Sequence, residues 1–266
     1  NVWSSVIAKD QDRKSGMPLK RRKTFIDIAT RRAKKMVFGI SADQFDPEVI
    51  SKLEEDNLIY RDQETSTISL PHDVLEDWAL EEFIEDKYNH NLDNLNEFLS
   101  AIGNEPAISR AFRLWLYRRL QFDESTYDFV EAILAADNIE NFWRDETIAA
   151  ILQHKSPHIF LQSMKDNLLK NDCALLIRFC FILRIACQKP NSHFTDSLTL
   201  DKNSGILRTL FLVPYGKGWE ALFNFIYDFR DELSNSIQNH IIELINEWCS
   251  VININDDLPS ESRIVG

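Results

Sequence analysis

The sequence has little glycine, proline and cysteine, and it has no long apolar run. Its 266 residues include 7 Gly, 8 Pro and 4 Cys. So few chain-breaking residues favour long helices joined by short loops over an all-β fold. No stretch of about eighteen apolar residues occurs, so we expect no transmembrane helix. Residues 1–5 lead into charge rather than an apolar segment, and no signal peptide is predicted.

The motifs of common catalytic and metal sites are also missing. The seven glycines never take the spacing of a phosphate-binding loop, and no strand ends in the paired acids of a Walker B motif. His154 and His158 are four residues apart, but Pro157 interrupts the helix that would align them on a metal. We therefore expect neither an enzyme nor a metal site in this chain alone.

Three of the four cysteines recur at intervals of seven residues. Cys173, Cys180 and Cys187 fall on one face of a predicted helix, about 10 Å apart along its axis. That separation is too long for a disulfide, so we expect reduced cysteines packed in the core. Reduced cysteines are typical of a cytoplasmic protein.

Charge is distributed unevenly along the chain. Residues 1–40 hold eleven basic and three acidic side chains, a net charge of +8, whereas residues 41–266 hold 19 basic and 39 acidic ones, a net charge of −20. The acidic remainder disfavours direct nucleic-acid binding, because it repels the phosphate backbone. The basic start can meet phosphate, an acidic neighbouring domain or only water, and a solvated helix is the simplest of these interpretations.

The first third of the chain has a mixed pattern. Residues 1–17 read as a connector, 18–36 as an amphipathic helix and 43–57 as a second helical region. Two β-prone runs, 58–61 and 67–70, then predict a hairpin. The order helix, helix, hairpin is that of a winged helix-turn-helix.

The rest of the sequence is predicted to be helical. Its apolar stripes indicate helices of about 11–20 residues at 72–88, 92–102, 105–121, 124–136, 140–153, 157–170, 172–188, 217–230 and 232–251. Short joints between them favour an α-helical repeat array of the HEAT or armadillo type. The predicted fold is thus mainly α: a winged-helix domain at 18–90, then helical repeats at 91–266 with an irregular insertion at 189–216.

A His-Asp pair marks the junction between the hairpin and the next helix. The segment runs Ser69-Leu70-Pro71-His72-Asp73-Val74 and continues into Leu75-Glu76-Asp77-Trp78-Ala79. A His at a helix N-terminus lies beside free backbone N–H groups, where anions bind. Asp73 is expected to cap the helix and to fix the backbone that orients His72. From the residues alone, a turn histidine followed by an ordinary cap remains the simpler interpretation.

This segment, with the helix-helix-hairpin order before it, resembles the end of the winged-helix domain of signal-transducing NTPases of the STAND class, which includes NACHT and NB-ARC proteins. In that family an x-His-Asp motif, often Met-His-Asp, occupies this corner; here Leu70 or Pro71 stands where Met is common. The resemblance covers residues 18–85. It implies that His72 contacts the phosphates of ATP or ADP held by an upstream NTPase domain, with Asp73 in support.

The resemblance also implies a function. The chain would be the sensor portion of an ATPase switch: ADP favours a closed form, a protein ligand on the repeats opens it, and ATP-bound subunits oligomerise, in some relatives for antiphage or immune defence. DNA reading by the predicted winged helix is disfavoured, because residues 47–56 carry four acids and one Lys. The first residue Asn1 and the polar tail at 259–263 suggest a piece excised from a longer polypeptide.

A second hypothesis needs no nucleotide. The chain can instead be a stand-alone helical scaffold that binds a protein partner through an acidic concave face. Under this hypothesis no NTPase domain lies upstream, and removal of residues 1–90 leaves partner binding intact.

Overall fold

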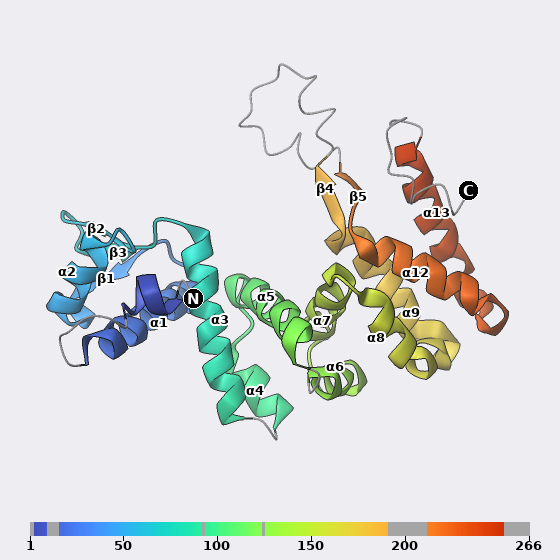
Figure 1. Cartoon of the computed structure of the whole chain (residues 1–266), viewed down its shortest axis with the longest axis horizontal. Helices are drawn as coiled ribbons and strands as arrows, with labels where there is room; N and C mark the ends of the chain where they lie inside the picture. Colours follow the sequence, from blue (N-terminus) through green and yellow to red (C-terminus); the bar gives the residue numbers. More distant parts are fainter. Residues whose placement is uncertain (1–2, 10–15, 92–93, 124–125, 191–211, 253–266) are drawn as a thin grey trace, which may run out of the picture. The chain divides into compact units, whose positions relative to one another are not determined.

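The computed structural model describes residues 3–9, 16–91, 94–123, 126–190 and 212–252, and the fold there is mainly helical with two small antiparallel sheets (Figure 1). The chain divides into two compact units, one formed by residues 1–119 with 135–139 and the other by 120–134 with 140–266. The sequence predicts that the helical repeats start at residue 91. The assignment of a winged-helix domain and a repeat domain stays a prediction. None of the helices in these ranges has the length and apolarity needed to cross a membrane.

The first unit combines helices with a three-stranded sheet. Its elements are η1 (Trp3–Ile7), α1 (Met17–Lys35), β1 (Ile40–Ser41), η2 (Ala42–Gln44), α2 (Pro47–Glu55), β2 (Tyr60–Asp62), β3 (Thr67–Ser69), α3 (Asp73–His90), α4 (Leu95–Ile102) and α5 (Pro106–Phe122). The strand order is β1-β3-β2, and both strand pairs are antiparallel. Helix α1 packs against α2 and α3, and α4 packs on α3.

Local chemistry accounts for the start of α2 and for the hairpin. Pro47 begins α2, and the Asp46 carboxylate before it accepts the Glu48 N–H at 3.0 Å. In the hairpin loop the Asp62 carboxylate accepts the backbone N–H groups of Glu64 and Thr65 at 2.9 and 3.4 Å, which closes the turn. The predicted helix, helix and hairpin are confirmed.

Two features of this unit were not predicted. Strand β1 pairs Ile40 with Ile68 of β3, and two residues are too short a run to show any periodicity. The segment that we read as a connector contains η1, whose Ile7 is fully buried. The buried Arg21 of α1 donates to the Ile7 carbonyl at 2.9 Å and pairs with Asp56 at 2.8 Å, so this segment packs on α1.

The second unit is built from packed helices and a short ribbon. Its elements are α6 (Thr126–Ala135, whose last residue clusters with the first unit), α7 (Asn141–Gln153), α8 (Pro157–Ser163), α9 (Lys165–Ala186), β4 (Gln188–Pro190), β5 (Leu212–Pro214), α12 (Lys217–Asp228), η3 (Arg230–Glu232), η4 (Asn235–Ile237) and α13 (Gln238–Ile252). Helix α12 packs on α7, α8 and α9, while α9 packs on α7 and α13. At Gly218 a Cβ would lie 2.6 Å from the Leu152 carbonyl oxygen, so this close approach of α12 to α7 requires glycine.

The predicted insertion at 189–216 is not irregular at its ends. Gln188 to Pro190 pair antiparallel with Leu212 to Pro214, and residues 191–211 lie outside the described part of the chain. The hairpin at 58–70 was the only β structure that we predicted, so this ribbon corrects the expectation. Three-residue strands of Gln, Lys, Leu, Val and Pro have neither the length nor the composition of a strand signal.

Cys173, Cys180 and Cys187 are buried as predicted, but they do not share one continuous helix. Residues 170–173 of α9 depart from helical geometry, with Cys173 left-handed at φ 60°, and Cys187 follows the end of the helix. The expectation of three cysteines on one helical face is therefore wrong at its first member. Burial raises the pKa of the Cys180 thiol to about 12, which keeps this sulfur protonated and unreactive.

The end of α1 supplies a test of backbone strain. Met36 closes α1 in the left-handed region (φ 51°, ψ 44°), donates to the Ala33 carbonyl at 3.1 Å and has a side chain 74% exposed. Because glycine alone adopts this conformation without a Cβ penalty, we expect Met36→Gly to be more stable than Met36→Ala by about 1 kcal/mol. Chemical denaturation measures the difference. Both variants lack the exposed side chain, and equal stabilities would contradict the backbone explanation.

Candidate functional site

The predicted site residues lie at the corner between β3 and α3. Ser69 ends β3, Leu70 is buried, and the side chains of Pro71, His72 and Asp73 are exposed. The His72 backbone is extended (φ −142°, ψ 138°), and its carbonyl accepts the Leu75 N–H at 3.1 Å. His72 therefore sits at the N-cap of the 18-residue helix α3, with an imidazole that solvent or a ligand can reach.

The expected capping role of Asp73 is wrong. His72 occupies the N-cap, Asp73 is already the first residue of α3, and no side chain caps this end of the helix. Asp is a common N-cap residue, and that preference places the N-cap at residue 73. Because the backbone of residue 72 is the extended one, the N-cap is instead His72, one position earlier. A carboxylate in the first turn still interacts favourably with the positive end of the helix dipole.

Strand pairing brings the end of α1 to the same corner. Ile40 pairs with Ile68, so the chain just before β1 runs beside the chain just after β3. Arg32 of α1 connects the segment before β1 to helix α3. Its Nε donates to the Phe38 carbonyl at 2.8 Å, and its Nη1 lies 3.3 Å from the Glu76 carboxylate in the first turns of α3. The Arg32 guanidinium also lies 5.7 Å from the centre of the Phe38 ring.

Large apolar side chains are exposed around this junction. Met36 is 74%, Phe38 79% and Val74 54% exposed, and Val37 between the first two is 41% exposed. We call these four residues the apolar rim. Exposed large apolar side chains are typical of a surface that another protein segment covers when they form one patch.

Helix α3 itself is acidic and is held between arginines of α1 and α5. The ion pairs to α1 are Arg32–Glu76 at 3.3 Å, Arg22–Glu82 at 2.8 Å and Arg22–Asp86 at 3.4 Å. Those to α5 are Arg110–Asp77 at 2.8 Å, Arg118–Glu81 at 2.7 Å and Arg119–Glu85 at 2.9 Å. We call this set the α3 clamp.

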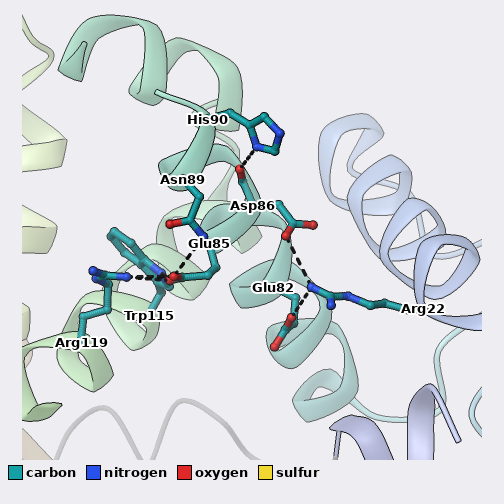
Figure 2. Close-up of polar contacts among 8 residues, drawn as sticks. All are labelled: Arg22, Glu82, Glu85, Asp86, Asn89, His90, Trp115 and Arg119. Atoms are coloured by element: carbon teal, nitrogen blue, oxygen red, sulfur yellow. Dashed lines mark hydrogen bonds and ion pairs between the residues drawn. The ribbon is translucent and has the colours of Figure 1, made fainter. Parts of the chain in front are cut away.

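Figure 2 shows the C-terminal half of the clamp. Arg22 reaches Glu82 and Asp86 from α1, while Arg119 and the Trp115 indole reach Glu85 from α5. The Trp115 Nε1–H donates to Glu85 at 2.6 Å. The clamp thus fixes the position of the helix whose first residue follows His72.

The clamp corrects an expectation from the sequence. A solvated helix is the simplest interpretation of the basic start of the chain. In the structure Glu82 and Asp86 pair with Arg22, and Glu81 with Arg118. Pairs separated by 30 to 70 residues leave no local signal, since they depend on which helix faces meet.

Burial perturbs several clamp carboxyls. Burial raises the pKa of Glu81 to about 7, although Arg118 acts in the opposite direction. Burial also raises the pKa values of Glu76 and Glu82 against the opposing effects of Arg32 and Arg22. The Arg118 side chain is about half exposed, so water screens its charge and burial dominates at Glu81.

His154 and His158 lie on either side of the helix break that the sequence predicts at Pro157. Helix α7 ends at Gln153 and α8 begins at Pro157, so His154 and His158 do not share a helix. His154 is buried, accepts the Ser156 N–H at 3.1 Å and meets the Phe160 ring edge-on, and burial lowers its pKa. Within the described ranges, no group of three or more His, Cys, Asp or Glu side chains is placed to hold a metal ion.

Comparison with known proteins adds no relative to this geometry. No protein-family model matches the chain, and no curated protein matches it in sequence.

The α3 clamp yields a prediction about pH. Burial raises the pKa of Glu81 from its ordinary value of 4.5 to about 7, so neutral Glu81 stabilises the fold below about pH 4.5 and this contribution is lost as the pH rises through 7. We expect Glu81→Gln to exceed the native chain in stability by roughly 1–2 kcal/mol at pH 8 and to match it at pH 5. Denaturation midpoints at the two pH values measure this.

The control for this experiment is Glu97→Gln, which alters an exposed carboxylate on α4 of the same unit. We expect its stability relative to the native chain to be the same at pH 5 and pH 8. If Glu81→Gln behaved like the control, burial of Glu81 would not be the cause of the pH dependence.

Proposed function

We propose that this chain is the regulatory portion of a STAND-type signalling ATPase, coupling recognition by its helices to nucleotide-dependent opening and oligomerisation. The observation that carries the proposal is the exposed His72 at the N-terminus of α3, directly after the hairpin. The chain itself hydrolyses no nucleotide under this proposal; ATP or ADP is held by an NTPase domain upstream, and the intact protein works in the cytoplasm.

The topology of the first unit supports a winged-helix assignment. Two helices precede the hairpin, and β1 adds to the hairpin through β3, which gives the order β1-β3-β2. Helix α2 is poorly suited to DNA, since it carries Glu48, Glu54 and Glu55 against Lys52. A winged helix with this charge is better suited to packing on a protein domain than to reading a DNA groove.

The chemistry of the corner supports a phosphate contact. The first backbone N–H groups of α3 have no partner inside the helix, and such a helix end attracts anions. The His72 imidazole can donate to a phosphate oxygen, more strongly when it is protonated. Arg32 and Arg110 near this end of α3 are engaged by Glu76 and Asp77, so His72 is the side chain proposed to meet the ligand.

The apolar rim supports a domain contact at the same corner. Phe38 and Met36 are more than 70% exposed beside α3, and burying them under an upstream domain would bring that domain's nucleotide close to His72. The packed helices of the second unit are the proposed sensor for a protein ligand, with HEAT-like repeats as the proposed architecture. Antiphage or immune sensing is the proposed biological setting.

The coding sequence upstream of Asn1 gives the first test. We expect a phosphate-loop motif between a strand and a helix within one or two domain lengths of this point. An upstream sequence without such a motif would contradict the ATPase proposal and favour the scaffold that binds a partner without nucleotide.

The second test concerns His72 directly. In the protein that includes the upstream domain, we expect His72→Ala to release bound ADP about 10–100-fold faster, the loss of one hydrogen bond to a charged group. His90→Ala is the matched control, because it removes an exposed His at the other end of α3. Fluorescent ADP in a stopped-flow chase measures release, and equal rates in all three proteins would exclude a phosphate contact for His72.

A further inference from the structure

Helix α9 contains a left-handed turn. Lys170 is extended there (φ −70°, ψ 166°), and Asn171, Asp172 and Cys173 are all left-handed, with φ values of 51°, 56° and 60°. Residues other than glycine adopt this conformation at a cost in free energy, and ordinarily they do so singly rather than three in succession. We call residues 170–173 the α9 turn.

The sequence of α9 does not by itself require this turn. Residues 165–186 contain neither glycine nor proline, at which most sharp helix kinks occur. Leu168 and Leu169 precede the turn and Ala174 and Leu175 follow it, and all four favour helix. A continuous right-handed helix is therefore open to this segment, so contacts from elsewhere in the unit must hold the α9 turn in its strained form.

Those contacts come from η4 and from Ser234, its N-cap residue. The Ser236 hydroxyl donates to the Asp172 carbonyl at 2.6 Å, and the Ser234 hydroxyl donates to the Asp172 carboxylate at 3.3 Å. The Ser234 N–H donates to the sulfur of the fully buried Cys173 at 3.4 Å. These bonds meet the backbone and side chains of residues 172 and 173 where the left-handed turn places them, so η4 and the turn stabilise each other.

The α9 turn also sets the position of α8. The N–H of Met164, the residue between α8 and α9, donates to the Phe160 carbonyl at 3.0 Å, and the Met164 carbonyl accepts the Leu168 N–H at 2.9 Å. Backbone hydrogen bonds therefore join α8 to residues 165–169, and the two move together. Because α8 packs on α12, a change of hand in the turn alters that packing.

We propose that the α9 turn is a two-state hinge: η4 holds it left-handed, and it rewinds into right-handed helix when η4 moves away. In the rewound state α9 is continuous from residue 165 to residue 186, and α8 shifts against α12. Since η4 leads directly into α13, a displacement at the start of α13 is transmitted to α8. The hinge lies within the second unit and stands apart from the role proposed for His72.

Two spin labels on α9 test the hinge. Asp166→Cys and Ile185→Cys place them at exposed positions, in a chain that also carries Cys249→Ser because Cys249 is the exposed one of the four native cysteines. A continuous helix, with a rise of about 1.5 Å per residue, places the two labelled Cα atoms roughly 28 Å apart. We expect pulsed EPR to give one distance in this reference chain. Ser234→Ala with Ser236→Ala should add a second population at the span of the continuous helix.

Two further variants serve as controls. Asn235→Ala lies between the two serines, but Asn235 accepts a hydrogen bond from Gln238 of α13 at 3.0 Å, so we expect this variant to keep the single distance. Asn171→Gly with Asp172→Gly, added to the serine double variant, should restore the single distance. Glycine removes the cost of the left-handed conformation and disfavours helix.

Three results would overturn the proposal. One is a serine double variant whose distances equal those of the reference chain. Another is a distribution that broadens with no population at the helical span, which would show that the turn loses order without rewinding. The third is a reference chain already at the helical span, which would show that α9 is continuous with η4 in place.

Discussion

The first unit depends on the balance of charge around α3. Six acidic side chains of this helix are paired with arginines of α1 on one side and of α5 on the other. Exposed ion pairs contribute little to stability, but Arg32 and Glu76 are both about nine-tenths buried, and removing one partner there would leave an uncompensated charge. The position of α3 therefore depends on the buried Arg32–Glu76 pair as well as on the burial of Leu80 and Ile84.

This constraint explains the charge asymmetry of the chain. Part of the basic start is matched within the unit, because Arg21, Arg22 and Arg32 pair with acids of the same unit. A basic first helix and an acidic third helix pair with each other across the 37 residues, 36–72, that lie between them. Charge patterns along a sequence indicate a ligand only where the structure leaves them unmatched.

Local signals predicted the local elements and failed at distant contacts. Pro47 after Asp46 and the Asp62 turn depend on neighbours in the chain, and the helix and hairpin that they bound were predicted correctly. Pro157 begins a helix as predicted, but that helix ends at Ser163 rather than at residue 170, and α9 begins at Lys165. Strand β1 and the β4–β5 ribbon were not predicted. Their strands are only two or three residues long and form by pairing with distant residues, so the local sequence carries no strand pattern. The α3 clamp was misread for the same reason, and the Asp73 cap was misplaced by one residue because the boundary follows the backbone of His72.

The candidate site and the clamp share one helix, and this gives the proposed switch a physical basis. His72 begins α3, and Arg32 contacts both the Phe38 segment and Glu76, so a shift of α3 changes the apolar rim and the imidazole together. Movement of α3 away from α5 would expose the buried Glu81, whose raised pKa reflects the cost of holding its charge out of water. Release of this carboxylate to solvent lowers the cost of separating the helices when Glu81 is ionised. Under the proposed function, a ligand at His72 and the charge state of the clamp would act on the same helix, so each would change the free energy of the other.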